Sequence, residues 1–236
     1  MINNTLKPIF FDLDGTLLNT APDISNAMKK TLQERGLPMH QDIDQHYHLF
    51  GSSCELLASL LNLSMKDPDF LSIREQFFSH YLDRIAEKTH YYPYIEKTLE
   101  LLIEHSIHWG IITNKPSVLT HKVVDAFPLL QKAHICLSGD SLPNPKPSPE
   151  PLLHACKTLT LQPSQCSYVG DTYTDCLAAQ RAGMKSIAVL YGYNKPTDNP
   201  ADWNADYYFN SSKSLFDWIQ SQLNQDVKDY THELTH

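Results

Sequence analysis

The sequence predicts an α/β protein: a doubly wound parallel sheet with a smaller all-helical domain inserted after the first strand. Short apolar runs rich in Ile, Val and aromatic residues alternate with helical stretches, which is the pattern of right-handed strand–helix–strand crossovers. One long stretch after the first run has helical patterns only. The chain of 236 residues is 42% hydrophobic and 19% charged, and it is long enough for one large domain with an insert.

Six apolar runs are the predicted strands, because runs of this composition are typical of strands buried on both faces of a sheet. These strands are expected at residues 8–13, 108–113, 133–137, 167–170, 186–190 and 206–209. The helices between them are expected at residues 95–105, 118–126, 149–158, 174–182 and 215–223. Ligands of a doubly wound sheet bind just beyond the carboxyl ends of its strands, so function is expected at that edge.

The inserted stretch shows helical patterns at residues 24–35, 54–61 and 71–86 and no convincing strand. We therefore predict a helical cap domain over residues 21–90, joined by hinges near 20–22 and 91–93. The core domain is expected to combine residues 1–20 and 91–224. Residues 225–236 are polar and are expected to form a disordered tail.

Composition excludes several classes of protein. The net charge of −8 and the pI of about 5.8 argue against binding to nucleic acid or to an anionic membrane. The five cysteines form no Cys-x-x-Cys pair, which favours reduced thiols over disulfides or a zinc site. No apolar run reaches the roughly 18 residues of a membrane span, and Asp12 and Asp14 interrupt the apolar stretch near the N-terminus where a signal peptide would lie. We expect a cytoplasmic monomer or homodimer.

Asp12 and Asp14 end the first predicted strand, in the segment Phe-Asp-Leu-Asp-Gly-Thr. Side chains alternate along a strand, so both carboxylates point to the same side. Buried acids need a partner, which makes the pair a metal site or an acid–base pair. A solvated loop or a helix N-cap is the alternative for an isolated Asp-x-Asp. Gly15 allows a sharp turn and the close approach of a ligand.

A second acidic pair follows the strand at 167–170. Asp171 comes directly after that strand, and Asp175 lies one helical turn later, so both side chains can face one point. Taken alone, Asp171 or Thr172 could equally well be a helix N-cap. With Asp12 and Asp14, the two acids make a pocket of three or four carboxylates, whose hard oxygen ligands suit Mg²⁺ far better than zinc.

Polar groups follow two further segments. Thr113 and Asn114 supply a hydroxyl and an amide at the end of the predicted strand 108–113, and the turn there offers backbone N–H groups to anionic oxygens. Lys146 lies between Pro145 and Pro147, which lower the entropic cost of presenting its side chain. A positioned cation is therefore favoured over a solvated surface lysine.

In this order, Asp-x-Asp-Gly-Thr, a strand-end threonine, a loop lysine and Gly-Asp-x-x-x-Asp resemble the four motifs of haloacid dehalogenase-like phosphatases. The resemblance covers nearly the whole chain and implies a Rossmann-like core with a helical cap. Phe-Asp-Leu-Asp-Gly-Thr-Leu, Thr-Asn-Lys, Lys-Pro-x-Pro-x-Pro-Leu and Tyr-Gly-Tyr are similar to the phosphoglycolate phosphatase branch. Residues 109–116 and 138–156 also resemble bacterial N-acetylmuramic acid 6-phosphate phosphatases of that branch.

The resemblance implies that the protein hydrolyses a small phosphomonoester through an aspartyl-phosphate. Asp12 would be the nucleophile, and Asp14 the general acid and then the general base. Mg²⁺ would be held by Asp12, the backbone carbonyl of Asp14, and Asp171. Asp175 would bind it through water or support the other ligands from behind.

The resemblance also implies how a phosphorylated metabolite binds. Thr113 and Asn114 would bind phosphoryl oxygens, and Lys146 would offset the charge on the nucleophile and the phosphate. Gly51 and Ser52, in a loop of the cap, would contact the substrate, although Ser52 suits a helix N-cap equally well. No Lys or Arg stands beside Gly51, which leaves the choice of substrate open.

Three alternatives remain beside a phosphoglycolate phosphatase. The first is a phosphatase of N-acetylmuramic acid 6-phosphate or of another sugar phosphate. The second is a phosphomutase of the β-phosphoglucomutase kind, which has the same four motifs. The third is a non-catalytic binding protein on the same fold, and it is disfavoured because Asp12, Asp14 and Lys146 are all present.

Overall fold

A six-stranded sheet, in the order β5–β4–β1–β6–β7–β8, forms the centre of the part of the chain that the structure describes. The structure is a computed structural model, and it describes residues 7–38, 43, 52–193 and 198–233. The strands are β1 (Ile9–Phe11), β4 (Trp109–Ile112), β5 (Ile135–Leu137), β6 (Ser167–Gly170), β7 (Lys185–Val189) and β8 (Tyr207–Phe209). All neighbouring strands are parallel, so the predicted doubly wound α/β fold is confirmed.

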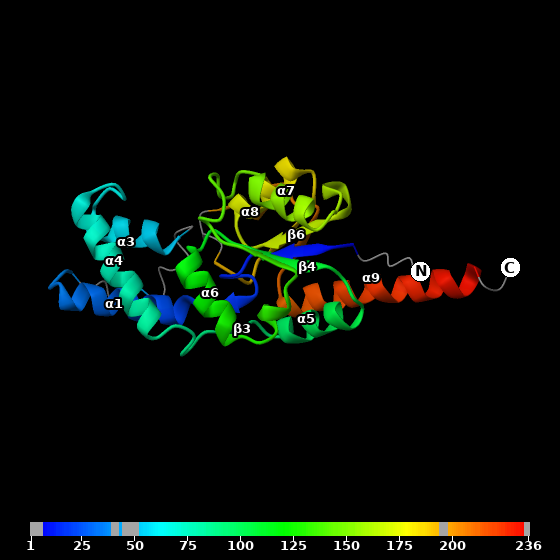
Figure 1. The fold of residues 1–236 in the computed structure, drawn as a ribbon, viewed down its shortest axis with the longest axis horizontal. Helices are drawn as coiled ribbons and strands as arrows, with labels where there is room; N and C mark the ends of the chain where they lie inside the picture. The colour runs from blue at the N-terminus through cyan, green and yellow to red at the C-terminus, as the bar shows by residue number, and fades with distance from the viewer. Residues whose placement is uncertain (1–6, 39–42, 44–51, 194–197, 234–236) are drawn as a thin grey trace.

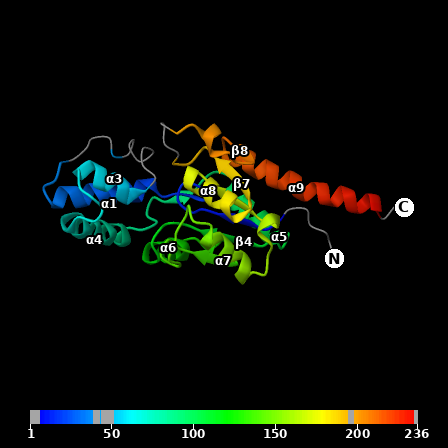
Figure 2. The same cartoon turned by 90° about the horizontal axis from the view of Figure 1, so that it is seen from above.

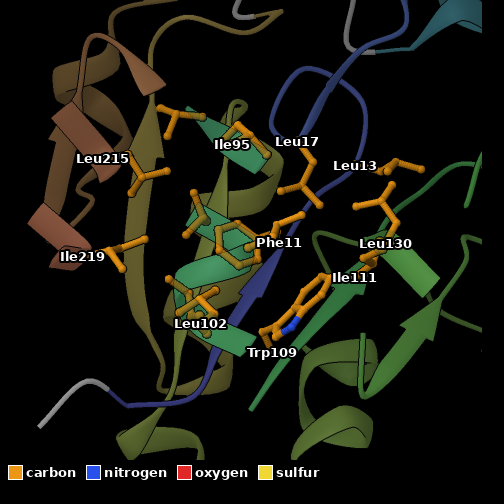
Figure 3. Close-up of a cluster of buried hydrophobic side chains, with 14 of the residues drawn as sticks. Phe11, Leu13, Leu17, Ile95, Leu102, Trp109, Ile111, Leu130, Leu215 and Ile219 are labelled. Carbon is orange, nitrogen blue, oxygen red and sulfur yellow. The ribbon is translucent and has the colours of Figure 1, made fainter. Parts of the chain in front are cut away.

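Helices cover both faces of this sheet (Figures 1 and 2). One face packs against α5 (Ile95–Glu104), α6 (Ser117–Ala126) and α9 (Ser212–Glu233), and the other against α7 (Glu150–Thr158) and α8 (Tyr173–Ala182). Figure 3 shows the first of these interfaces, where Phe11 and Trp109 from the central strands meet Leu102, Leu215 and Ile219 from the helices. The burial of both faces explains why the strands are continuous apolar runs.

Helices α1 (Ala21–Glu34), α3 (Ser53–Leu61) and α4 (Pro68–Asp83) lie beyond one end of the sheet and form the cap (Figure 1). They share a hydrophobic cluster, to which Met28, Leu57 and Phe77 contribute one side chain from each helix, and Leu119 of α6 and Tyr193 join it from the core. The all-helical insert is therefore confirmed in the described residues. The division into domains at residues 20/21 and 90/91 stays a prediction.

A short antiparallel ribbon joins cap and core, and the sequence pattern does not predict it. It pairs β2 (Leu18–Asn19) with β3 (His90–Tyr91), so the chain leaves and re-enters the core through neighbouring strands. Two residues per strand are too few for an alternating pattern to be read. The ribbon lies directly beside both predicted hinges.

The C-terminal helix is longer than expected. The apolar spacing ends at Leu223, but α9 continues to Glu233, so the expectation of a disordered tail is wrong for residues 225–233. Residues 212–233 contain no Gly or Pro, and a helix that projects past the sheet needs no further apolar face (Figure 1). Despite the length of α9, none of the described helices is long and apolar enough to cross a membrane.

Candidate active site

Three neighbouring strands end at one point of the sheet edge. β1 lies between β4 and β6, and the register aligns Phe11 with Ile111 on one side and with Val169 on the other. Asp12, the next residue after Phe11, donates its backbone N–H to the Val169 carbonyl at 2.9 Å. The residues that follow β4 and β6 therefore lie close to Asp12, as the parallel topology predicts.

Asp12, Asp171 and Asp175 form a cluster of buried carboxylates. Each offers one oxygen, and these oxygens all lie within 4.8 Å of one another. Asp14 lines the same cleft but its side chain stands outside this trio, while Leu13 between the two acids is buried in the core. The predicted alternation of side chains after β1 is thus what the structure shows.

Asp171 is held by hydrogen bonds from two directions. It accepts from the Thr16 hydroxyl at 3.0 Å and from the Tyr193 backbone N–H at 2.6 Å. Gly15 has a φ of +84°, and a Cβ there would lie 2.2 Å from an Asp171 oxygen, so only glycine lets the loop approach this closely. Burial raises the pKa of Asp171 well above its usual range, and the nearby charges of Asp175 and Asp12 raise it further.

Lys146 is the cation at the centre of the cluster. Its Nζ lies 2.7 Å from an Asp175 oxygen, 3.0 Å from an Asp12 oxygen and 2.7 Å from the Tyr168 hydroxyl oxygen. Burial alone would lower the pKa of Lys146, but the charges of Asp12 and Asp175 outweigh it and the pKa is raised. The lysine is therefore charged and fixed, as the flanking prolines suggest.

The carboxylates remain crowded despite Lys146. Burial raises the pKa of Asp12 to about 6, against the lowering effect of Lys146 and with further raising by Asp175 and Asp14. The Asp12 oxygen that lies 3.0 Å from Lys146 Nζ is buried, and it makes no hydrogen bond of proper geometry. A set of hard oxygen donors with surplus negative charge fits a divalent cation of the Mg²⁺ type.

Asp175 combines two roles that the sequence leaves open. Its second oxygen accepts from the backbone N–H of Thr172 at 3.1 Å and from the Thr172 hydroxyl at 2.6 Å, at the start of α8. The helix-capping arrangement and the carboxylate cluster are thus formed by the same side chain. Since its other oxygen pairs with Lys146, Asp175 is held more by protein groups than Asp12 is.

Thr113 and Asn114 follow β4 and line the cleft, but their side chains differ in how much of their hydrogen-bonding capacity is already used by the protein. The Thr113 hydroxyl accepts only the Lys115 backbone N–H, at 3.2 Å, in the described contacts. The Asn114 side chain donates to the Lys146 carbonyl at 2.8 Å and accepts from the Lys146 N–H at 3.0 Å. The resemblance implies that Asn114 binds phosphoryl oxygens, which stays a prediction, and the structure shows that its side-chain amide holds the backbone of the lysine loop.

Lys115 is a site residue to which sequence reasoning gives no role. Its Nζ donates to both Asp14 oxygens, at 3.0 and 3.2 Å, and to the Tyr81 hydroxyl of the cap at 3.1 Å. Thr20, at the hinge, donates its hydroxyl to Asp14 at 2.6 Å. Lys115 directly follows Thr113 and Asn114 in the chain, which is a signal that could have found it, whereas nothing in the sequence points to Tyr81.

A cleft of about 830 Å³ lies between core and cap. Its floor includes the carboxylates and both lysines, and its cap side includes Ser52, Phe77, Phe78 and Tyr81. The Ser52 hydroxyl accepts from the Glu55 N–H at 3.1 Å and caps α3, so Ser52 both caps its helix and faces the cleft. Gly51 lies outside the described residues.

The structure therefore defines a class of protein, a doubly wound α/β domain with a helical cap and a buried carboxylate cluster at its strand ends. The family model of haloacid dehalogenase-like hydrolases matches residues 9–189 of this chain. The chain belongs to that family, and its phosphatases generally depend on a divalent metal.

Named relatives are similar over most of the chain. N-acetylmuramic acid 6-phosphate phosphatase of Pseudomonas aeruginosa is 32% identical over 92% of this chain and 96% of its own length. Phosphoglycolate phosphatase of Nitrosospira multiformis is 37% identical over 82% of this chain and 87% of its own. A crystal structure of a predicted phosphoglycolate phosphatase from Haemophilus somnus superimposes with a TM-score of 0.78 at 28% identity, covering 89% and 96% of the two chains.

Proposed function

We propose that this protein is a Mg²⁺-dependent phosphatase that hydrolyses a small phosphomonoester, with Asp12 as the nucleophile. One observation carries the proposal: Asp12, Asp171, Asp175 and Lys146, from three separate segments of the chain, converge on one buried point of the cleft. A buried nucleophilic carboxylate beside a cation and metal-binding oxygens is the arrangement that phosphoryl transfer to a carboxylate needs.

The reaction has two halves. In the first, an Asp12 oxygen bonds to phosphorus, the bond from phosphorus to the leaving oxygen breaks, and Asp14 gives that oxygen a proton. In the second, Asp14 takes a proton from water, the water oxygen bonds to phosphorus, and the bond to Asp12 breaks, releasing phosphate. Thr20 and Lys115 fix the Asp14 side chain at the cleft, which supports the acid–base role, and such a group contributes about 10²–10⁴ in rate.

Cations are needed because the reactants repel each other. A carboxylate about 4 Å from a phosphate dianion is opposed by roughly 8 kcal/mol at an effective dielectric constant of 20. Lys146 offsets part of this charge. Asp12, Asp171 and the Asp14 carbonyl would hold Mg²⁺, with Asp175 behind them. When bound, the ion would stabilise negative charge on the phosphoryl oxygens.

The substrate is a small phosphorylated metabolite. The compounds named for the relatives, phosphoglycolate and N-acetylmuramic acid 6-phosphate, are both phosphomonoesters that carry a carboxylate. Thr113 would bind a phosphoryl oxygen, with Asn114 keeping Lys146 in place. The cap closes one side of the cleft and limits the water around the reacting groups.

Phosphate release from a panel of phosphomonoesters, with Mg²⁺ and with EDTA, tests the proposal. We expect release by the wild type with Mg²⁺ and none in EDTA. Asp12→Asn should abolish release while the protein stays folded, because it relieves carboxylate crowding. Asp217→Asn, at an exposed acid paired with Lys213, is the matched control and should be fully active. Turnover by Asp12→Asn or undiminished turnover in EDTA would contradict the mechanism, and conversion of a sugar phosphate without net phosphate release would favour a phosphomutase.

A further inference from the structure

Helix α4 presents one row of side chains along the cap side of the cleft. Arg74, Phe77, Phe78 and Tyr81 are spaced i, i+3, i+4 and i+7, so they share a face of the helix. Phe77, Phe78 and Tyr81 line the cleft. Tyr81 marks the inner end of the row, because its hydroxyl accepts a hydrogen bond from Lys115, which also binds Asp14. Arg74 marks the outer end, one helical turn beyond Phe77 and Phe78 and outside the lining of the cleft.

Arg74 is a cation without a carboxylate partner among the residues that the structure describes. Its guanidinium carbon lies 5.9 Å from the centroid of the Phe78 ring, and its buried Nε has no hydrogen-bond partner. The two lysines of the cleft differ from it, because Lys115 pairs with Asp14 and Lys146 pairs with Asp12 and Asp175. The buried Nε is closed to a ligand, so an anion would bind the terminal N–H groups of this half-buried side chain, through the charge-assisted hydrogen bonds that a guanidinium makes to a carboxylate.

Arg74 also acts on the wall of the cleft. Cys54, in the first turn of α3, lines the cleft, and burial raises the pKa of its thiol while the charge of Arg74 opposes that rise. The guanidinium therefore stands near two lining residues, Phe78 on α4 and Cys54 on α3.

The length of the row limits what Arg74 can bind. Arg74 and Tyr81 are seven residues apart, which at about 1.5 Å per residue is about 10 Å along the helix. Phosphoglycolate places its carboxylate carbon only three bonds from phosphorus, a span of about 4 Å at about 1.5 Å per bond. A hexose phosphate with a carboxylate on the opposite side of its ring has about eight bonds between the two groups and spans roughly twice that distance.

We propose that Arg74 is a specificity-determining residue, which binds an anionic group at the end of the substrate remote from the phosphate. The substrate class is then a sugar-sized phosphomonoester with a remote carboxylate, not a two-carbon one. This inference rests on the proposed function of the same site. The volume of about 830 Å³ accommodates a sugar ring, and the Phe77 and Phe78 rings offer it an apolar wall. N-acetylmuramic acid 6-phosphate, named for a relative, has this chemistry.

Steady-state kinetics with three substrates test the inference. N-acetylmuramic acid 6-phosphate carries the remote carboxylate, and N-acetylglucosamine 6-phosphate is the same kind of sugar phosphate without it. Phosphoglycolate carries a carboxylate that lies too close to its phosphate to reach Arg74. We expect Arg74→Gln to lower kcat/KM for the first by about 10- to 100-fold, mainly through KM, and Arg74→Lys to recover part of the loss. For the neutral sugar phosphate, Arg74→Gln should change kcat/KM by less than about threefold.

A merely structural role for Arg74 predicts a different pattern. It would lower kcat/KM equally for both sugar phosphates, and that result would overturn the inference, as would no change on either one. A wild-type preference for phosphoglycolate over both sugar phosphates would also overturn it. Thermal melting of each variant shows whether the protein remains folded.

Binding measured without turnover separates the inference from the proposed function. Calorimetric titration of N-acetylmuramic acid 6-phosphate into Asp12→Asn, with and without Arg74→Gln, should show about a 10- to 100-fold weaker dissociation constant for the double variant. If this difference appears but the wild type releases no phosphate, the proposed function fails and the role of Arg74 stands. If the wild type releases phosphate but the titrations agree, only the role of Arg74 fails.

Discussion

Two regions beside the cleft hold their cations in opposite ways. One is the sheet edge, with Asp12, Asp175 and Lys146, and the other is the cap wall, the face of α4 from Arg74 to Tyr81. At the sheet edge, three oxygens lie 2.7–3.0 Å from Lys146 Nζ. On the cap wall, Arg74 rests over an aromatic ring and its buried Nε has no hydrogen-bond partner. The reacting groups are therefore fixed before substrate arrives, whereas we infer that the cap keeps the charge of Arg74 for the substrate itself.

The two regions also differ in their support. The Asn114 side chain hydrogen-bonds to both the backbone N–H and the carbonyl of Lys146. These two bonds join the loop after β4 to the loop after β5 at the sheet edge. The cap contacts the core through the hydrogen bond between Tyr81 and Lys115, and through Tyr193, whose hydroxyl binds the hinge. Substitutions at the sheet edge should therefore cost stability and turnover together, and substitutions on the cap wall should change mainly substrate choice.

Lys146→Met should give the largest loss. It leaves Asp12 and Asp175 as buried carboxylates without their cation, and breaking a buried ion pair in this way costs about 3–5 kcal/mol. Turnover should disappear as well. Urea denaturation measures the loss of stability, and Arg74→Gln is the matched control on the cap, with an expected change below about 1 kcal/mol.

The double variant Lys146→Met/Asp12→Asn sharpens this prediction. Removing the Asp12 charge should restore part of the stability that Lys146→Met loses, because one of the two uncompensated carboxylates is gone. Equal stability of Lys146→Met and the wild type would show that the sheet edge does not depend on this lysine, and the contrast between the two regions would then be wrong.

Stability without metal should depend on pH through the crowded carboxylates, and Asp12→Asn isolates the part that comes from Asp12. Its pKa is raised from 3.8 to about 6, so the folded state binds the proton more tightly than the unfolded state does. Stability therefore falls as pH rises from about 4 to about 6, by an amount of order 1–3 kcal/mol. In EDTA, Asp12→Asn should be more stable than the wild type at pH 7, and the difference should shrink toward pH 4.5.

Mg²⁺ supplies the control for the pH experiment. A bound divalent ion compensates the Asp12 charge, so saturating Mg²⁺ should raise the melting temperature of the wild type at pH 7 more than that of Asp12→Asn. A constant difference between the two proteins at every pH in EDTA would show that Asp12 is not the crowded carboxylate.

Much of the fold could be predicted because buried strands and helices leave periodic signals. The predicted strand at 167–170 is the observed β6, and α5 begins at Ile95 as predicted. The clustering of the acidic residues could be predicted from the topology, since residues that follow parallel strands lie at the same edge of the sheet. The β2–β3 ribbon and the last turns of α9 were missed because neither depends on an apolar pattern.

The pairing of polar groups across loops could not be predicted. Asn114 and Lys146 are 32 residues apart, and their two hydrogen bonds depend on how the loops after β4 and β5 meet. The same holds for Lys115 and Tyr81, which come from core and cap. Residue type shows what a side chain can bind, and only the three-dimensional register of the loops decides which partner it reaches.

Tyr193→Phe should have a smaller effect at the joint between the two regions. The Tyr193 hydroxyl accepts the backbone N–H groups of Thr20 and Ala21, at 2.7 and 2.9 Å, and donates to Asn19. Losing it leaves hinge N–H groups unbonded, at a cost of about 1–3 kcal/mol in urea denaturation.

Tyr208→Phe is the matched control for Tyr193→Phe, because its hydroxyl also accepts a backbone N–H but lies at an exposed position. We expect it to cost less than about 1 kcal/mol. If the two variants lose equal stability, the hinge contact is no more important than an ordinary surface hydrogen bond.

Ser52→Ala should have the smallest effect and tests the outer rim of the cap wall. The serine caps α3 by accepting the Glu55 N–H, and removal of an N-cap costs about 1 kcal/mol. Asp67→Ala, which removes the N-cap of α4 away from the lining of the cleft, is the control for stability alone. If capping is the only role of Ser52, the two variants should match in melting temperature and keep wild-type kcat/KM. A loss of kcat/KM confined to Ser52→Ala would instead place its hydroxyl on the substrate, and it would extend substrate recognition on the cap from α4 to the start of α3.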